Sequence, residues 1–224
     1  MHPYLIPLQK QLKASADSEN AFNQAAYMKN KFKFFGLTTD LRREVCKPFL
    51  QKDILPAKQD VESIVKTLWE MPQREYHYFA QELLAKYQKQ FQEEDIDLLE
   101  YLIVNNSWWD SVDFIAANLV GQYFKLYPKK RKAYITKWIS SGNMWLQRTC
   151  LLFQLKYKAD TDTALLTDII KKLTPSKEFF INKAIGWALR EYSKTGPKWV
   201  KDFVSAHSLS NLSKKEALKV ISKK

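Results

Sequence analysis

A tyrosine that recurs at nearly constant spacing is the feature that most limits what this chain can fold into. Tyr87, Tyr123, Tyr157 and Tyr192 are separated by 36, 34 and 35 residues, and a lysine follows each of them within two residues. Each tyrosine lies near the end of a long segment of helical periodicity, and a shorter helical segment precedes each long one. A lysine there suits the negative end of a helix dipole. This spacing predicts a helical hairpin as the repeating unit.

The rest of the chain is also helical in its periodicity and has no alternating run rich in Val, Ile or Thr. We expect an all-α fold, a curved HEAT-like or armadillo-like solenoid in which equivalent helices of stacked hairpins line the inner face. A single domain over residues 1–224 would contain N-terminal helices in 1–55, about four to five hairpins in 58–206 and a C-terminal capping helix in 212–222. A non-repetitive helical bundle is the alternative.

Composition favours a protein without membrane spans or a metal site. With 46% hydrophobic residues, the chain is long enough for a sizeable core, and no apolar run approaches the ~18 residues needed to cross a bilayer. Its N-terminus lacks the features of a signal peptide. Cys46 and Cys150 have no local partner, which suits a reducing compartment, and His2, His77 and His207 form no ligand pair. We therefore expect a cytoplasmic protein without a metal site.

Basic residues are concentrated in the second half of the chain. The formal charge is +12, but residues 1–120 hold 14 basic and 17 acidic residues, net −3, whereas residues 121–224 hold 22 and 7, net +15. This asymmetry favours a polyanionic partner, most commonly nucleic acid. A lysine-rich surface that only aids solubility is the alternative. An anionic membrane is less favoured, because no lone amphipathic basic helix or lipidation motif stands out.

Two adjacent tryptophans and two aspartates stand together at a predicted helix start. Ser107 and Asp110 fit the S-x-x-D capping box, which gives Asp110 a structural role. Asp113 lies beyond capping range, and Trp109, four residues before it, shares its side of the helix. Trp108 is expected to pack within the apolar stripe. A large aromatic ring and a carboxylate thus share a half-exposed ridge.

The tyrosine register brings further charged residues to equivalent positions. Asp113 stands ten residues before its repeat tyrosine, and Arg148 and Lys183 each stand nine before theirs. Trp187 and Arg190 share a helical face with Lys183. If the long helices line the inner face, aromatic planes and one acid lie in a basic groove. The ordinary explanations are that each tryptophan packs in the core and that Asp113 is paired with Arg148.

A carboxylate in a basic groove opposes phosphate binding, so its presence indicates that positive charge develops there during a reaction. Cleavage of a deoxynucleotide's glycosidic bond has this demand. The sugar becomes oxocarbenium-like as the base departs, and a carboxylate can stabilise that charge and orient the attacking water. Tryptophan faces add cation–π attraction to a cationic purine or sugar. This chemistry needs no metal or cofactor.

Several strings of residues, taken in order, resemble one family along nearly the whole chain: the AlkD-type alkylpurine DNA glycosylases, which are built from HEAT-like repeats. The strings cover residues 27–36 with Thr39 and 42–43, 107–113, 145–148 with 153–158, and 176–181 with 183–187 and 190–192. The resemblance implies DNA repair by a glycosylase. Because no lysine is clearly positioned as the Schiff-base nucleophile of a bifunctional enzyme, we expect a monofunctional glycosylase without a cofactor. Its substrates would be positively charged N3- and N7-alkylated purines in duplex DNA, such as 3-methyladenine and 7-methylguanine.

The resemblance also implies roles for individual residues. Asp113 matches the catalytic carboxylate, Trp109 and Trp187 match the residues that flank the lesion nucleotide, and Arg148 matches a contact with the neighbouring backbone. Further DNA contacts are expected at Tyr27, Thr39, Arg43, Lys156 and Arg190 from the resemblance, and at Lys183 from the repeat register. Duplex DNA with alkylated purines is the expected partner of a monomer that needs no obligate protein partner and no membrane.

One departure from the family pattern is Asp40, which follows Thr39 where the family has proline and adds a negative charge near an expected contact. Two rivals remain open. Relatives that keep the solenoid but lack the carboxylate look like binders of unusual DNA structures, and the presence of Asp113 with both tryptophans disfavours that class. A protein-binding HEAT scaffold explains the repeats but not a basic half that carries aromatic residues.

Overall fold

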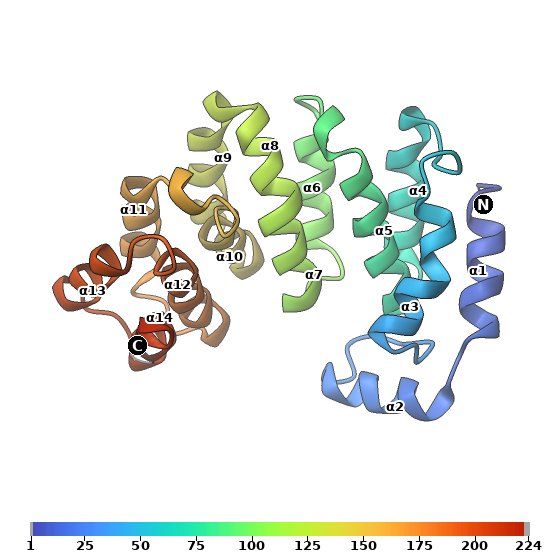
Figure 1. Cartoon of the computed structure of the whole chain (residues 1–224), viewed down its shortest axis with the longest axis horizontal. Coiled ribbons are helices and arrows are strands. Elements are labelled where there is room, and N and C mark those ends of the chain that lie inside the picture. Colours follow the sequence, from blue (N-terminus) through green and yellow to red (C-terminus); the bar gives the residue numbers. More distant parts are fainter. Residues whose placement is uncertain (1, 222–224) are drawn as a thin grey trace. The chain divides into compact units, whose positions relative to one another are not determined.

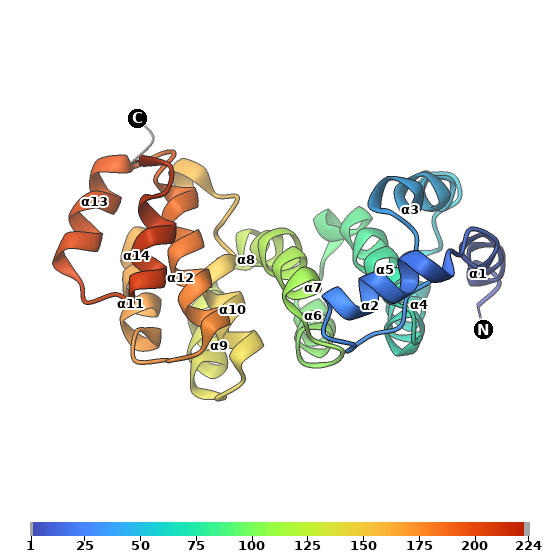
Figure 2. The ribbon, with the colours of Figure 1, turned by 90° about the horizontal axis from the view of Figure 1, so that it is seen from below.

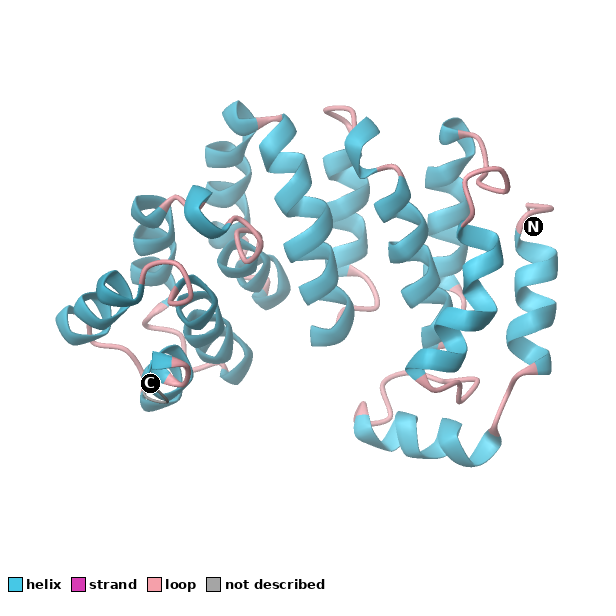
Figure 3. Ribbon diagram, in the orientation of Figure 1, coloured by secondary structure: helices cyan, strands magenta, loops and turns pink. Residues whose placement is uncertain are grey.

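A computed structural model describes residues 2–221 of the chain. Within that range the secondary structure consists of helices and loops, apart from an isolated bridge between Lys33 and Gln73 (Figure 3). The predicted all-α fold of repeated helices is confirmed. The chain divides into two compact units, of which the first ends at Gln90 and the second begins at Phe91. The single HEAT-like domain expected over residues 1–224 stays a prediction.

The first unit is built around the hairpin of α4 and α5. Its elements are α1 (Leu5–Ala14), α2 (Ser18–Tyr27), α3 (Thr39–Cys46), the 3₁₀ turn η1 (Lys47–Leu50), α4 (Lys58–Glu70), α5 (Arg74–Lys86) and the 3₁₀ turn η2 (Gln88–Gln90) (Figure 1). Helix α4 buries Val61, Ile64, Val65 and Leu68, whose spacing of three and four residues forms one apolar stripe. Helix α4 packs against α5, and this stripe belongs to the buried core.

The second unit contains the remaining hairpins and the C-terminal helices. Its elements are α6 (Asp95–Val104), α7 (Trp109–Phe114), η3 (Ile115–Val120), α8 (Gly121–Leu126), α9 (Pro128–Ser140), α10 (Met144–Leu152), η4 (Lys158–Asp160), α11 (Thr163–Leu173), α12 (Phe179–Tyr192), α13 (Pro197–Ala206) and α14 (Asn211–Leu218). Helices α7 and α8 are joined without a break by η3, which is a π-helical stretch with wider turns. Helix α14 lies along α12 (Figures 1 and 2).

Three of the four recurring tyrosines make the same kind of hydrogen bond. The Tyr123 hydroxyl donates to the Glu93 carbonyl at 2.8 Å, and the Tyr157 hydroxyl donates to the Gly121 carbonyl at 2.6 Å. The Tyr87 hydroxyl donates in the same way to the carbonyl of Pro56. In each case the acceptor lies 30 to 36 residues earlier in the chain. The tyrosine period therefore reflects a tie between the end of one long helix and backbone about one repeat earlier.

The predicted capping box at Ser107 is wrong. Helix α7 begins at Trp109, and its N-cap is Trp108, which makes no side-chain cap bond. The Ser107 hydroxyl instead donates to the Ile103 carbonyl at 2.5 Å. It therefore satisfies a carbonyl at the end of α6, where the last turn of a helix lacks intrahelical donors.

The C-terminal helix also differs from its predicted bounds of 212–222. Helix α14 begins at Asn211, where the Ser210 hydroxyl accepts from the Ser213 amide at 3.1 Å. It ends at Leu218, and residue 222 lies outside the described residues.

A buried carboxylate orders the loop between α2 and α3. Glu75, in α5, is 1% exposed, and its Oε1 accepts from the amides of Phe35, Gly36 and Leu37 at 3.0, 2.9 and 3.3 Å. Gly36 has a φ of +93°, and a Cβ there would lie 2.0 Å from the Asp17 carbonyl oxygen. The loop therefore needs both a glycine and an anionic acceptor in order to pack against the hairpin.

Removal of the Glu75 carboxylate should destabilise the first unit strongly. We expect Glu75→Ala to lower the free energy of unfolding by about 3 kcal/mol, because buried amides that lose their acceptor cost about 1–3 kcal/mol each and some will find water. Urea unfolding followed by circular dichroism measures this. Glu62→Ala is the matched control, since Glu62 forms an exposed pair with Lys66 and should change stability by less than about 1 kcal/mol. Similar losses in both variants would contradict the anchoring role.

Candidate functional site

Asp113 and Arg148 form a two-point ion pair in the second unit. The Arg148 Nε donates to Asp113 Oδ1 at 2.7 Å, and its Nη2 donates to Asp113 Oδ2 at 2.8 Å. The remaining nitrogen, Nη1, donates to the Phe180 carbonyl. Asp113 belongs to α7, Arg148 to α10 and Phe180 to α12. One guanidinium therefore joins three helices.

The pair is asymmetric in its exposure. The Arg148 side chain is 4% exposed, whereas the Asp113 side chain is 11% exposed. All three nitrogens of Arg148 donate to protein atoms, and its expected contact with the DNA backbone stays a prediction. The two hydrogen bonds from Arg148 fix the orientation of the Asp113 carboxylate. The pairing that the sequence left as an ordinary explanation is present, and the carboxylate still reaches the surface.

The charge state of Asp113 depends on two opposing effects. Burial raises the pKa of the Asp113 carboxyl, and the hydrogen bonds and charge of Arg148 act in the opposite direction. The nearby Asp110 carboxylate adds a smaller upward effect on this pKa. Loss of the guanidinium would therefore leave only effects that favour the protonated acid.

An aromatic cluster supports the ion pair. The rings of Trp108, Trp145 and Phe180 contact one another with centroid distances of 5.1 to 5.7 Å. The Arg148 guanidinium carbon lies 5.8 Å from the Phe180 ring centroid. The expectation that Trp108 packs against apolar neighbours is confirmed. These large, stiff rings fix the start of α7 against α10 and α12, and so help to fix the direction of Asp113.

The exposed edge of Asp113 opens into a hollow of about 350 Å³. Its lining comes from α7 and η3, from the segment after α10, and from α12, and consists of Asp113, Phe114, Ala117, Asn118, Leu155, Lys156, Trp187 and Glu191. Asn118 lies in the π-helical stretch, and its Oδ1 accepts from the Lys156 Nζ at 2.5 Å. A carboxylate, an indole and an ammonium group are thus brought together, and π-helical turns of this kind are frequent at functional sites.

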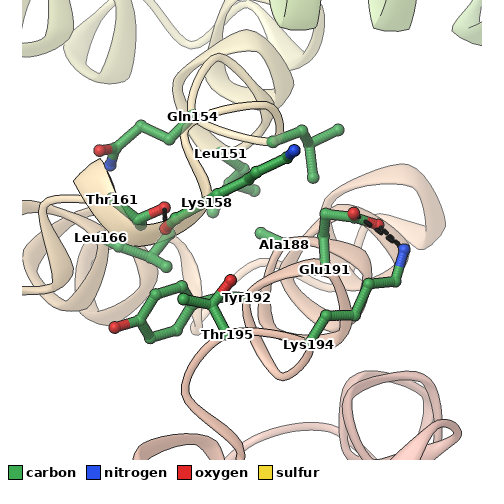
Figure 4. Close-up of a pocket in the computed structure, with 11 residues that line it drawn as sticks. Leu151, Gln154, Lys158, Thr161, Leu166, Ala188, Glu191, Tyr192, Lys194 and Thr195 are labelled. Carbon is green, nitrogen blue, oxygen red and sulfur yellow. Dashed lines mark hydrogen bonds and ion pairs between the residues drawn. The ribbon is translucent and has the colours of Figure 1, made fainter.

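A second hollow lies between the end of α10 and the end of α12, as Figure 4 shows. It is lined in part by Leu151, Gln154 and Tyr192, and on its α12 side Lys194 pairs with Glu191 at 2.7 Å. None of the predicted site residues lines it. The hollow that holds Asp113 is therefore the better candidate, because it joins the carboxylate to an aromatic face.

Helix α12 supplies two cations that converge on one acid. Lys183 Nζ lies 2.8 Å from Glu216 Oε1, and Arg190 Nη1 lies 2.7 Å from Glu216 Oε2. The Glu216 side chain is 10% exposed and belongs to α14. Sequence reasoning missed Glu216, because α14 follows the last repeat tyrosine and falls outside the register. Asn118, Trp145 and Phe180 were also missed as site residues, and nothing in their spacing distinguishes them from ordinary helical positions.

Four other predicted site residues are not among the residues that line the Asp113 hollow. Trp109 is the first residue of α7, is half-buried, and is not part of the lining of the Asp113 hollow. Tyr27, Thr39 and Arg43 belong to the first unit and are exposed, with Tyr27 at the end of α2 and the other two in α3. Their role as DNA contacts stays a prediction.

The departure at Asp40 is compatible with the start of α3. The N-cap is Thr38, whose hydroxyl accepts from the Leu41 amide at 3.4 Å, and Asp40 lies in the first turn. An acidic residue is favourable at this end of the helix dipole.

Among the residues that the structure describes, no group of three or more His, Cys, Asp or Glu side chains is arranged to hold a metal ion. No described helix is both long enough and apolar enough to cross a membrane.

Comparisons with known proteins agree with this fold. A family model described as "DNA alkylation repair enzyme" matches residues 8–221, so the chain belongs to that family. The family acts in the repair of alkylated DNA, which makes this chain a DNA repair protein with an expected affinity for DNA. No curated protein matches the chain significantly.

A solved structure is also similar along nearly its full length. It is described as a predicted DNA alkylation repair enzyme from Enterococcus faecalis, and it is 31% identical with a TM-score of 0.85. The alignment covers 93% of this chain and 98% of that chain. The resemblance drawn from the sequence strings is therefore confirmed at the level of the family.

Acid should weaken the docking of α14 through Glu216. Hydrogen bonding from Lys183 holds the pKa of the Glu216 carboxyl below its ordinary value of 4.5, and the Arg190 charge adds to this effect. A carboxyl with a lowered folded-state pKa stabilises the fold above its unfolded pKa, and this stability is lost as pH falls through the folded value. We expect the melting temperature of the wild type to fall more than that of Glu216→Gln between about pH 6 and about pH 3. Equal falls would contradict this coupling.

Proposed function

We propose that this protein is a monofunctional DNA glycosylase that hydrolyses the N-glycosidic bond of positively charged N3- and N7-alkylated purines. Membership of the DNA alkylation repair family supports the substrate class. The single observation that carries the proposal is the Asp113 carboxylate, held from one side by Arg148 and open on the other to a hollow shared with Trp187. Substrates of this class include 3-methyladenine and 7-methylguanine.

The chemistry requires an anion at a fixed place. An alkylated purine carries a positive charge and leaves as a neutral base, so its departure needs no acid. The sugar left behind is oxocarbenium-like, and a carboxylate close to it stabilises the developing charge. A carboxylate has about four lone-pair directions, of which Arg148 uses two, so Asp113 retains acceptor capacity for a water molecule or for the sugar. The reaction proposed needs no cofactor or metal.

The aromatic residues supply attraction for cations. Trp187 lines the hollow beside Asp113, and Trp109 stands one turn before Asp113 on α7. An indole face attracts a cationic purine or sugar by about 0.5–2 kcal/mol, depending on how far the pair is desolvated. A neutral base would gain little from these faces. We therefore propose that selectivity for cationic lesions comes from the indoles and the carboxylate together.

The partner proposed is duplex DNA that contains alkylated purines. Lys156 reaches the same hollow, where Asn118 fixes its ammonium group. It is the cation best placed to contact a phosphate next to the lesion, and Lys183 and Arg190 are proposed as further backbone contacts from α12. Tyr27, Thr39 and Arg43 are proposed contacts from the first unit. We further propose that the protein acts as a monomer in the cytoplasm, without an obligate protein partner.

Replacement of Asp113 tests the proposed chemistry directly. We expect Asp113→Asn to slow release of 7-methylguanine from duplex DNA by about 100-fold or more, as is typical when a transition-state charge loses its partner. Single-turnover assays with enzyme in excess measure this step. Asp110→Asn is the matched control, because it removes the same charge from the same helix and should keep a rate near that of the wild type. Unchanged release by Asp113→Asn would refute the role of this carboxylate.

Replacement of Arg148 separates a positioning role from a DNA contact. We expect Arg148→Gln to move the acid limb of the rate profile to higher pH, because burial raises the Asp113 pKa and the opposing guanidinium is gone. Activity that needs ionised Asp113 would then be lost at a higher pH as the solution is acidified. The salt dependence of DNA binding should match that of the wild type. A flatter salt dependence with an unmoved pH profile would show that Arg148 contacts phosphate instead.

The competing proposal is a non-catalytic protein that binds unusual DNA structures. The two-point pairing of Asp113 with Arg148 favours it in one respect, since a paired carboxylate has part of its charge neutralised. The two proposals differ in base release from alkylated duplex DNA. Binding without release by the wild type would support the binder.

A further inference from the structure

The two cations of α12, Lys183 and Arg190, both form ion pairs with the carboxylate of Glu216. Lys183 and Arg190 are seven residues apart, which places them about 10 Å apart along the helix axis. Glu216 lies between them and contacts one with each of its oxygens, at 2.8 and 2.7 Å. The Lys183 and Arg190 side chains are 38% and 24% exposed, whereas that of Glu216 is 10% exposed. The cations face solvent while their common partner lies behind them.

The position of Glu216 is set by close packing of α14 on α12. A Cβ built on Gly186 would lie 2.5 Å from the Glu216 Cβ and 2.8 Å from the Ser213 carbonyl oxygen, so only glycine permits this approach. The Ser213 hydroxyl donates to the Asn182 carbonyl at 2.8 Å in the same interface. The close approach at Gly186 and the Ser213 hydrogen bond fix α14 on α12, and they thereby fix the position of the Glu216 carboxylate. Glu216 is therefore part of the packed structure and not a mobile surface acid.

The arrangement reduces the charge that α12 presents. Two cations and one anion leave a net charge of +1, where the sequence pattern of Lys183, Trp187 and Arg190 suggests +2 on this face. Trp187 lies between the two cations in sequence and lines the hollow that contains Asp113. Any phosphate bound by these cations must share them with a carboxylate that repels it. The affinity of this face for an ordinary DNA backbone is thereby lowered.

We propose that Glu216 is an internal counter-ion that restrains Lys183 and Arg190, so that undamaged DNA is held weakly beside Trp187 and discrimination in favour of the lesion is kept high. This rests on the proposed function, because it takes the α12 cations to contact DNA. Glu216 is a positioning residue in this account. A protein that searches intact DNA for rare lesions gains from weak, salt-sensitive backbone binding, since the energy for recognition then comes from the lesion itself.

The test is the salt dependence of binding to an undamaged duplex, measured by fluorescence anisotropy with the full chain. We expect Glu216→Gln to bind several-fold more tightly than the wild type and to steepen the slope of log K against log salt by about 0.9, the value for one more neutralised phosphate. Glu216→Asp keeps the charge and should keep the wild-type slope. Selectivity for 7-methylguanine duplex over undamaged duplex should fall in Glu216→Gln.

Asp202→Asn is the matched control. Asp202 pairs with Lys198 on α13 at 2.8 Å, so this change also removes one negative charge and releases one lysine, but away from the proposed site. Its slope should stay close to that of the wild type. An equal effect of Glu216→Gln and Asp202→Asn would overturn the proposal, since net charge alone would then explain it. Weaker binding by a Glu216→Gln protein that melts like the wild type would also overturn it.

Two further variants extend the test. The second of them retains Glu216, so it keeps the test decisive if Glu216→Gln folds poorly, and it separates the inference from the function on which it rests. Arg190→Gln combined with Glu216→Gln removes one charge of each sign and should restore the wild-type slope. Lys183→Gln with Arg190→Gln should flatten the slope. If that last pair binds DNA like the wild type while Asp113→Asn still abolishes base release, the counter-ion proposal fails and the glycosylase proposal stands. If the wild type releases no alkylated base, the proposed function fails.

Discussion

The ion pair between Asp113 and Arg148 is the interaction on which the candidate site depends. Burial of a guanidinium and a carboxylate costs several kcal/mol for each ion unless the hydrogen bonds are well made. Here every nitrogen of Arg148 donates to a protein acceptor, two to the carboxylate and one to the Phe180 carbonyl. Arg148 therefore links α7, α10 and α12, and the carboxylate that it holds lines the hollow. The guanidinium is buried and lies 5.8 Å from the centroid of the Phe180 ring.

The same pair reconciles two demands on one carboxylate. A fully buried aspartate would be held neutral or locked away, and a fully exposed one would be loosely placed and screened by water. Asp113 is fixed by Arg148 on its inner side and retains a small exposed surface towards the hollow. The cations of the unit have partners of their own: Lys156, which lines the same hollow, is bonded to Asn118, and Lys183 and Arg190 are paired with Glu216. The site thus combines one oriented anion with cations whose reach is restrained.

Much of the fold was predictable from the sequence because the repeat has a physical cause. Tyr87, Tyr123 and Tyr157 each donate a hydrogen bond to a backbone carbonyl about one repeat earlier. The spacing of these tyrosines therefore reflects the length of one helical hairpin. The register also placed Asp113 and Arg148 in neighbouring repeats, where they do pair. The burial of Arg148 was not predictable, because its third bond is to a backbone carbonyl of α12. The contact of Glu216 with α12 was not predictable for another reason. It depends on the close packing of α14 against Gly186, and no local sequence pattern indicates that packing.

The central claim is that Arg148 acts on the reaction only through Asp113, and a double-mutant cycle tests it most directly. The measurement is the single-turnover rate of 7-methylguanine release by the wild type, Asp113→Asn, Arg148→Gln and the variant that carries both changes. The account predicts a large loss for Asp113→Asn and no further loss when Arg148→Gln is added to it. Losses that multiply in the double variant would contradict the account, because Arg148 would then contribute to catalysis or DNA binding independently of the carboxylate.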